Sequence, residues 1–83
     1  MPAFDYSAFA ELFPGKSPLG PSRARYLRFD TAAEALRFAV EELPRDVLRG
    51  SMLEVDEERF NSHQIGELYN ASRYPLSRAE EAA

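Results

Sequence analysis

Few residues in this sequence could carry out catalysis. The 83 residues contain no cysteine, and they contain a single histidine, His63, and a single lysine, Lys16. A Ser-His-Asp triad would have to recruit His63 at the start of a predicted helix, and no nucleophile-elbow pattern occurs that would expose a serine. The absence of cysteine also excludes disulfides and thiolate metal sites. We therefore predict that the protein is not an enzyme and has no catalytic residue.

A metal site would have to use the acidic residues around position 57. Asp56, Glu57 and Glu58 lie close in sequence to His63 and could together bind a divalent ion. They lack the alternating spacing and the glycine of a calcium loop, and the sequence has no second histidine for an i, i+4 zinc pair. The four glycines are scattered, so there is no glycine-rich phosphate loop. We predict no metal, no cofactor and no small-molecule substrate.

Three arginines on one predicted strand, Arg23, Arg25 and Arg28, raise an alternative function in nucleic-acid binding. Ribbon-helix-helix repressors place such a strand in the major groove of DNA. That fold joins its two helices by a turn, whereas a second predicted strand separates the helices here. The net charge of −4 and the pI near 4.9 also oppose contact with phosphates. Pairing of the arginines with the acidic residues between 54 and 58 on a neighbouring strand is the simpler explanation, and a small DNA-associated regulator remains the alternative.

The elements that must position these residues begin with a short amphipathic segment over residues 1–13. Phe9, Leu12 and Phe13 fall at positions i, i+3 and i+4, so we expect them on one face of a short helix. A Pro-Gly pair then ends that helix. The segment 14–22 holds three prolines and two glycines, a composition typical of a linker.

Alternating and helical apolar patterns follow along the rest of the chain. Strands are predicted over 23–29 and 51–55, with a third conceivable around 58–60, and helices over 31–43 and 62–71. The pattern leaves open whether the strands pair in parallel or antiparallel fashion. We therefore predict an α+β fold, with a small two- or three-stranded sheet, two main helices packed on one face of it, and the short N-terminal helix.

Capping residues mark the starts of both main helices. Thr31 followed three residues later by Glu34 matches a capping box, and Asp30 is the rival N-cap. Asn61 or Ser62 caps the second helix.

The predicted folded unit is small, which favours binding over chemistry. We expect residues 1–22 to form the amphipathic segment and linker, residues 23–76 to form one domain, and residues 77–83 to form a flexible tail. The predicted core comprises Leu27, Phe29, Leu36, Val40, Leu43, Leu53, Val55, Phe60, Ile65 and Leu68. A domain of this size buries little surface, and a two-stranded sheet leaves two unpaired edges.

Apolar side chains that the predicted core does not absorb are the candidates for an interaction surface. They are Phe9, Leu12, Phe13, Tyr26, Phe38 and Met52. Either the N-terminal helix packs on its own domain and covers the others, or these side chains contact a second copy or another protein. A non-enzymatic protein–protein interaction module, with self-association among its modes, is the leading functional prediction.

Three stretches, FDTAAEALRFAVEELP, LEVDEERFN and IGELYNASRYPL, lie within residues 26–76. This region resembles small uncharacterised bacterial proteins of unknown function. The resemblance implies a cytoplasmic bacterial protein, and it implies no activity, ligand or catalytic residue. No apolar stretch approaches the roughly 20 residues of a membrane-spanning helix, so we expect no membrane association.

Overall fold

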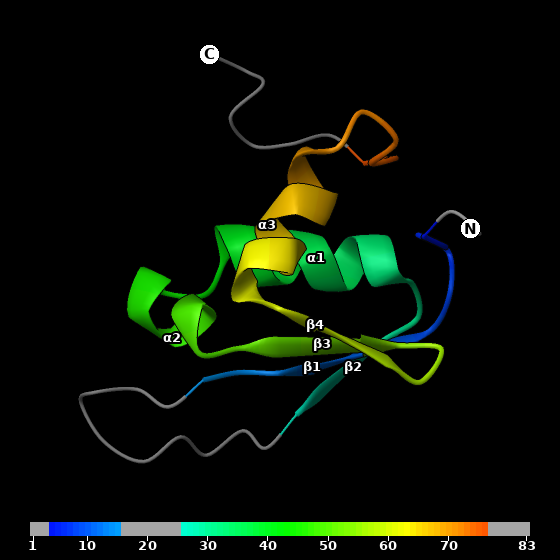
Figure 1. Ribbon diagram of the computed structural model, residues 1–83. Helices are drawn as coiled ribbons and strands as arrows, with labels where there is room; N and C mark the ends of the chain where they lie inside the picture. The colour runs from blue at the N-terminus through cyan, green and yellow to red at the C-terminus, as the bar shows by residue number, and fades with distance from the viewer. Residues whose placement is uncertain (1–3, 16–25, 77–83) are drawn as a thin grey trace.

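The computed structural model describes residues 4–15 and 26–76, which build a sheet with helices over one of its faces (Figure 1). The sheet has four strands: β1 (Ala10–Phe13), β2 (Leu27–Phe29), β3 (Met52–Val55) and β4 (Glu58–Asn61). They lie in the order β2-β1-β3-β4, and each neighbouring pair is antiparallel. The α+β class is confirmed, but the sheet has four strands where two or three were predicted.

Strand β1 lies in the centre of the sheet, where the sequence predicted a helix. Ala10 and Leu12 are fully buried beneath the helices, and Glu11 and Phe13 alternate onto the opposite face. The spacing of Phe9, Leu12 and Phe13 also fits one helical face, but a helix of about nine residues is marginal in water. As a strand the segment pairs on both sides, with β2 and with β3. The prediction of an N-terminal helix is therefore wrong.

The central position of β1 also changes the extent of the folded unit. A domain that began near residue 23 would lack the strand that joins β2 to β3. The predicted linker from residue 16 onward and the predicted tail over 77–83 lie outside the described residues.

Three helices accompany the sheet: α1 (Ala32–Glu41), α2 (Arg45–Arg49) and α3 (Ser62–Asn70). Helices α1 and α3 lie over the same face of the sheet, as predicted, and α2 is a short helix that precedes β3 (Figure 1). Thr31 is the N-cap of α1, and its side-chain oxygen accepts a hydrogen bond from the backbone N–H of Glu34 at 3.2 Å. No helix in the described part of the chain has the length and apolar character that a bilayer crossing requires.

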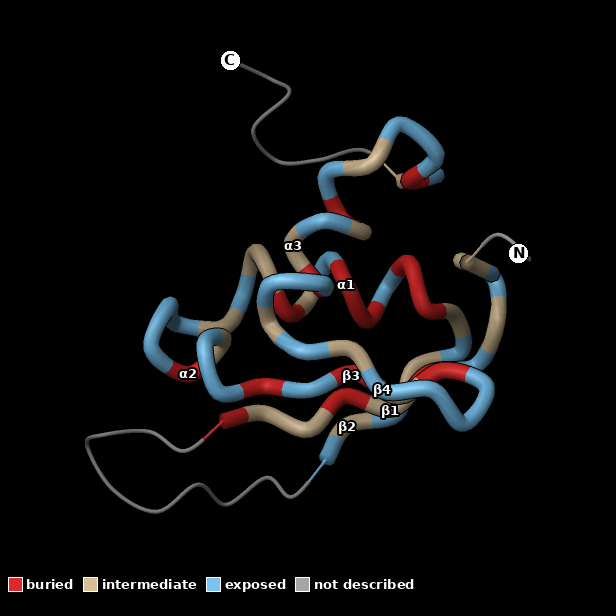
Figure 2. The backbone as a smooth tube through the Cα atoms, viewed as in Figure 1, coloured by how far each residue is buried: buried red, intermediate tan, exposed pale blue. Residues whose placement is uncertain are grey.

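The core lies between the sheet and the two main helices (Figure 2). Of the predicted core residues, Leu36, Leu53, Val55 and Ile65 are buried, and the remaining six pack against them while partly exposed. Side chains outside the ten residues of the predicted core complete it: Ala10, Leu12, Ala32, Ala33, Ala35, Ala39, Tyr69 and Tyr74. The alanines of α1 allow the helix to lie close to the sheet, because they add little volume between the layers.

Two tyrosines attach the ends of the described chain to this core. The Tyr6 hydroxyl donates to the carbonyl oxygen of Leu68 in α3 at 2.8 Å. The hydroxyl of Tyr74 donates to the carbonyl of Ala33 in α1 at 3.1 Å, and both partners are buried. The segment before β1 and the loop after α3 are therefore each bound to a helix by a hydrogen bond from a tyrosine hydroxyl to a backbone carbonyl.

A tight turn at Asp56 and Glu57 joins β3 to β4. Both residues adopt positive φ angles, 52° and 69°. A two-residue hairpin turn needs such angles to match the right-handed twist of the two strands that it joins. The turn restores the inward direction of Phe60, which lies opposite Leu53 in the register. The third strand that the sequence made conceivable around residues 58–60 is β4.

The start of α3 gives a direct test of local stability. The Asn61 side chain accepts from the Gln64 backbone N–H, and the Gln64 side chain accepts from the Asn61 backbone N–H, both at 2.9 Å. We expect Asn61→Ala to lower the free energy of unfolding by about 1 kcal/mol and the melting temperature by roughly 4–8 °C. Thermal unfolding monitored by circular dichroism measures this. Ser72→Ala, in the exposed loop after α3, serves as the control and should leave the melting temperature unchanged.

A candidate docking face on the open side of the sheet

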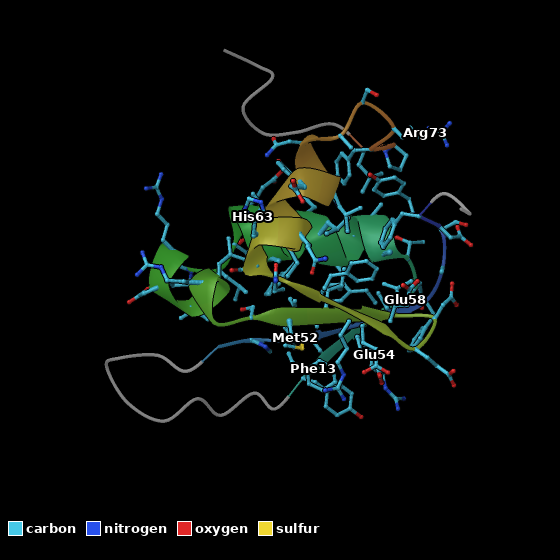
Figure 3. The ribbon with its side chains drawn as sticks, in the orientation of Figure 1. Phe13, Met52, Glu54, Glu58, His63 and Arg73 are labelled. Atoms are coloured by element: carbon cyan, nitrogen blue, oxygen red, sulfur yellow. The ribbon has the colours of Figure 1, made fainter. Side chains whose placement is uncertain are left out.

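One face of the sheet has no helix over it among the described residues (Figure 1). Alternation along the strands sends a second set of side chains to this side, and Figure 3 shows Phe13, Met52 and Glu54 projecting from the sheet away from the helices. We call this surface the open face. It is formed by Phe9, Glu11, Phe13, Tyr26, Arg28, Met52, Glu54 and Arg59.

Four charged residues form a row straight across the open face. The register places Arg28 beside Glu11, Glu11 beside Glu54 and Glu54 beside Arg59. Each arginine pairs with its neighbouring glutamate at 3.4 Å from Nε to a carboxylate oxygen. The charges therefore read plus, minus, minus, plus from one edge of the sheet to the other, and we call these four residues the charged row.

The charged row corrects one expectation from the sequence. Arg28 was expected to pair with acidic residues of the strand that contains Glu54, but β1 lies between those two strands. Arg28 therefore pairs with Glu11, and Glu54 pairs with Arg59 from β4. Both arginine side chains are about two-thirds exposed, at 64% and 69%. Such exposed pairs define register and contribute little to stability.

Apolar side chains lie on the open face beside the charged row. Phe13 and Tyr26 stack with their ring centroids 5.6 Å apart, and Met52 is the neighbour of Phe13 on β3. Phe9, Tyr26 and Met52 are 52%, 42% and 37% exposed, and they are the large hydrophobic residues classed as exposed among those the structure describes. All three lie on this one face, so the exposed apolar surface is concentrated in one place.

Arg28 connects the charged row with the aromatic side chains. Its guanidinium carbon lies 5.6 Å from the centroid of the Tyr26 ring and 6.0 Å from that of Phe9. These distances are within the range of cation–π attraction. Together with the ion pair to Glu11, these contacts orient the exposed guanidinium on the sheet surface.

The structure brings four of the six predicted interaction residues together on the open face, namely Phe9, Phe13, Tyr26 and Met52. Leu12 does not belong to it: the side chain is fully buried in the core because it alternates with Glu11 and Phe13 along β1. Phe38 lies on α1, half-buried, with its ring 5.6 Å from that of Phe29. Of the three predicted nucleic-acid residues, Arg28 is on the open face, and Arg23 and Arg25 lie outside the described residues.

Three residues of the open face were not among the predicted site residues: Glu11, Glu54 and Arg59. The period-two pattern would have placed Glu54 outside the core, and it would have placed Glu11 there too if the N-terminal segment had been interpreted as a strand. Their alignment in one row follows from the order of the strands in the sheet. Local patterns in the sequence do not reveal that order.

The residues considered for catalysis and metal binding lie apart from the open face. His63 is on α3, where its Nε2 lies 3.5 Å from a carboxylate oxygen of Glu67, and both side chains are well exposed. Asp56 and Glu57 form the hairpin turn at the far end of β3, and Figure 3 shows Glu58 separated from His63 along the length of the sheet. Within residues 4–15 and 26–76, no three His, Asp or Glu side chains gather as metal ligands would.

A shallow hollow of about 360 Å³ lies between the N-terminal segment and the loop after α3. Asp5 and Ser7 line one side of it, and Arg73 and Leu76 line the other. The Ser7 hydroxyl and backbone N–H both donate to Asp5 Oδ1, at 2.6 and 3.0 Å. These hydrogen bonds lower the pKa of Asp5 below its ordinary value, with the side-chain bond contributing most. The Asp5 carboxylate thus accepts its hydrogen bonds from Ser7, within the same turn.

Neither the hollow nor the residues near His63 combine a nucleophile, a base and a buried polar group. The open face differs from its surroundings in another way, because it concentrates exposed apolar area and ordered charges. Comparison of the chain with protein-family models, with curated proteins and with solved structures finds no match.

Proposed function

We propose that this protein is a non-enzymatic interaction module that self-associates through the open face of its sheet. The observation that carries the proposal is the position of Phe9, Tyr26 and Met52: the exposed large hydrophobic residues of the described chain all lie on the one sheet face that lacks a helix. Association of two sheets face to face would remove this apolar area from water, which is the main favourable term in protein association.

The charged row and the aromatic pair support a second copy as the partner. Consider a two-fold axis between two stacked sheets, parallel to the strands and midway between β1 and β2. It lays Arg28 over Glu11 of the second copy and Glu11 over Arg28 of the second copy. The same operation brings the stacked Phe13 and Tyr26 of each copy together as four aromatic rings. The charges of Arg28 and Glu11 are therefore self-complementary around this axis.

The position of the axis matters, because an axis through the centre of the sheet has the opposite effect. It would place Glu11 over Glu54 of the second copy and Arg28 over Arg59 of the second copy. Like charges at an interface oppose association. The charged row thus selects an offset dimer over a centred one, which is a source of specificity rather than of affinity.

The expected interface is small. The offset axis stacks β1 and β2 of one copy on β2 and β1 of the other. Met52 lies at the rim of this contact, beside the aromatic rings. The area buried would fall below the roughly 1,200 Å² of a standard interface, in the range of transient contacts. We expect a dimer dissociation constant on the order of 10–100 µM.

The alternative of DNA binding has less support than self-association. Arg28 is the one predicted DNA-contacting arginine among the described residues, and Glu11 balances its charge at 3.4 Å. Glu11 and Glu54 occupy the centre of the open face and would repel a phosphate backbone.

Substitution of one aromatic residue tests self-association. We expect Phe13→Lys to weaken dimerisation by at least tenfold, or about 1.4 kcal/mol, because each copy loses an aromatic ring from the cluster and the axis brings two like-charged ammonium groups near each other. Sedimentation equilibrium over about two decades of concentration around the expected constant measures this. Tyr26→Lys, at the more exposed position of the same cluster, should act in the same way.

The matched control is Ser72→Lys, which adds the same charge in the exposed loop after α3 and should leave the association constant unchanged. Thermal unfolding of each variant shows that the fold is retained. A wild-type protein that remains monomeric throughout this range, or equal effects of Phe13→Lys and Ser72→Lys, would contradict the proposal.

A further inference from the structure

A second surface lies at the edge of the sheet and shares Arg28 with the open face. A hollow of about 470 Å³ opens between β2 and α1. Phe29 of β2 and Phe38 of α1 form its apolar part, with their ring centroids 5.6 Å apart. We call this hollow the edge groove, and its charged residues are Arg28, Asp30, Glu34, Arg37 and Glu42.

Strand β2 presents one side of its backbone to this groove. In the described sheet β2 is the outermost strand, and its one strand neighbour is β1. An edge strand carries backbone N–H and C=O groups that can pair with an extended segment from another chain. A groove between an edge strand and a helix adds pockets for alternate side chains of such a segment.

The charges at the edges of the sheet argue against a second copy in this groove. The charged row ends in arginine on both sides, with Arg28 on β2 and Arg59 on β4. If two edges paired in the register of this row, arginine would lie directly opposite arginine, which is unfavourable between neighbouring strands. Arg28 has one acidic neighbour, Glu11, on its inner side, and its side chain remains 64% exposed. A single carboxylate on a strand added at the outer side can therefore also pair with it.

The other side of the groove limits what the remaining positions can be. Asp30, Glu34 and Glu42 outnumber Arg37 among the other charged residues of the groove, so acidic side chains are disfavoured on the helix side. Residues next to the carboxylate alternate to that side, where they meet Phe29 and Phe38. Apolar side chains fit these positions best.

We propose that the edge groove binds an extended segment of a partner protein by strand addition to β2, with an acidic residue opposite Arg28 and an apolar residue on each side of it. This interaction goes beyond self-association and uses a surface that shares only Arg28 with the open face. The carboxylate would give Arg28 an acidic neighbour on its outer side, opposite Glu11 on its inner side. The two apolar side chains would cover the exposed sides of Phe29 and Phe38. Because β2 has three residues, the contact is short and the affinity modest.

Two blocked pentapeptides test the proposal, Thr-Val-Glu-Val-Thr and Thr-Val-Lys-Val-Thr. Both are palindromic, so either strand direction presents the same side chains. The protein is the full chain carrying Phe13→Lys, a position outside the edge groove, so the result does not depend on whether the wild type self-associates. Binding is followed by ¹⁵N–¹H chemical shifts and by amide hydrogen exchange.

We expect the glutamate peptide to shift the amides of Leu27–Phe29 and Phe38, to slow exchange at the outward amides of β2, and to bind at least fivefold more tightly than the lysine peptide. Arg28→Glu should reverse this preference. The exposed position of Arg28 makes retention of the fold expected, and the ¹⁵N–¹H spectrum verifies it. Equal binding of both peptides to both proteins, or shifts confined to residues away from β2 and α1, would overturn strand addition while leaving self-association to be judged by sedimentation.

Discussion

Gly15→Ala is expected to destabilise the protein by about 3 kcal/mol, the upper part of the range for overpacked sites. A Cβ atom at this position would lie 2.5 Å from the carbonyl oxygen of Val47, 2.8 Å from the carbonyl carbon of Gly50 and 2.9 Å from its Cα. All three are backbone atoms, so no flexible side chain can move aside. The end of β1 and the end of α2 would have to separate.

That separation would also break a buried hydrogen-bond chain. The Gly15 N–H donates to the Ser51 hydroxyl at 3.0 Å, and this hydroxyl donates to the carbonyl oxygen of Val47 at 2.8 Å. Ser51 is only 3% exposed, so groups that lose these partners would not be fully compensated by water. These two hydrogen bonds therefore connect the end of the central strand β1 to the segment that leads into β3.

Urea unfolding followed by circular dichroism measures the effect, with Gly66→Ala as the matched control. Gly66 lies inside α3, and a Cβ there meets no atom within 4 Å apart from its chain neighbours and the backbone of its own helix. Alanine is the better helix former by roughly 1 kcal/mol, so Gly66→Ala should raise stability. The two glycine-to-alanine substitutions are therefore expected to change the free energy of unfolding in opposite directions. Stability changes of equal sign and size would show that β1 and α2 are not in close contact.

The elements that the sequence predicted well contain their own local signals. The helix at 32–41 has a capping threonine and a regular apolar stripe, and the helix at 62–70 begins at a capping box. The strands at 27–29 and 52–55 alternate apolar and polar side chains. Caps and periodicity act over a few residues, so they can be recognised without knowledge of the tertiary fold.

The central strand could not be recognised in this way. In residues 9–13 the helical spacing of Phe9, Leu12 and Phe13 competes with a period-two pattern in which Ala10 and Leu12 face inward. Alanine gives a weak hydrophobic signal, although the side chain is fully buried here. Pairing with strands far away in sequence decided between the two patterns, and such tertiary context overrides local preference.

The same limit applies to the open face. Alternation alone predicted that Tyr26 and Met52 point away from the core, and both are exposed. It could not show that Phe13 stacks on Tyr26 or that Arg28 pairs with Glu11, because both contacts require β1 to lie beside β2. Residue types and periodicity thus predict which side chains are exposed, whereas strand order determines which of them meet.

Two charge reversals test the contacts of the offset dimer directly. In the offset dimer Arg28 faces Glu11 of the second copy, and the two-fold axis creates this contact twice. Arg28→Glu would place four carboxylates around the axis, and Glu11→Arg would place four guanidinium groups there. Each variant alone should dimerise at least tenfold more weakly than the wild type, or about 1.4 kcal/mol, because like charges oppose each other across the interface.

A mixture of the two variants separates contacts within a chain from contacts between chains. Both variants have lost the ion pair between Arg28 and Glu11 that the wild type forms at 3.4 Å within one chain, and mixing cannot restore it. Between chains, however, each carboxylate of one variant would face a guanidinium of the other. The ion pairs across the interface would then be complete.

The most direct measurement is therefore sedimentation velocity of Arg28→Glu, of Glu11→Arg and of their equimolar mixture at the same total concentration, with native mass spectrometry to identify the species. Self-association through the open face predicts two monomeric variants that form a one-to-one heterodimer when mixed. A mixture that sediments as the sum of its separate components, beside a dimeric wild type, would show that the open face does not form the interface.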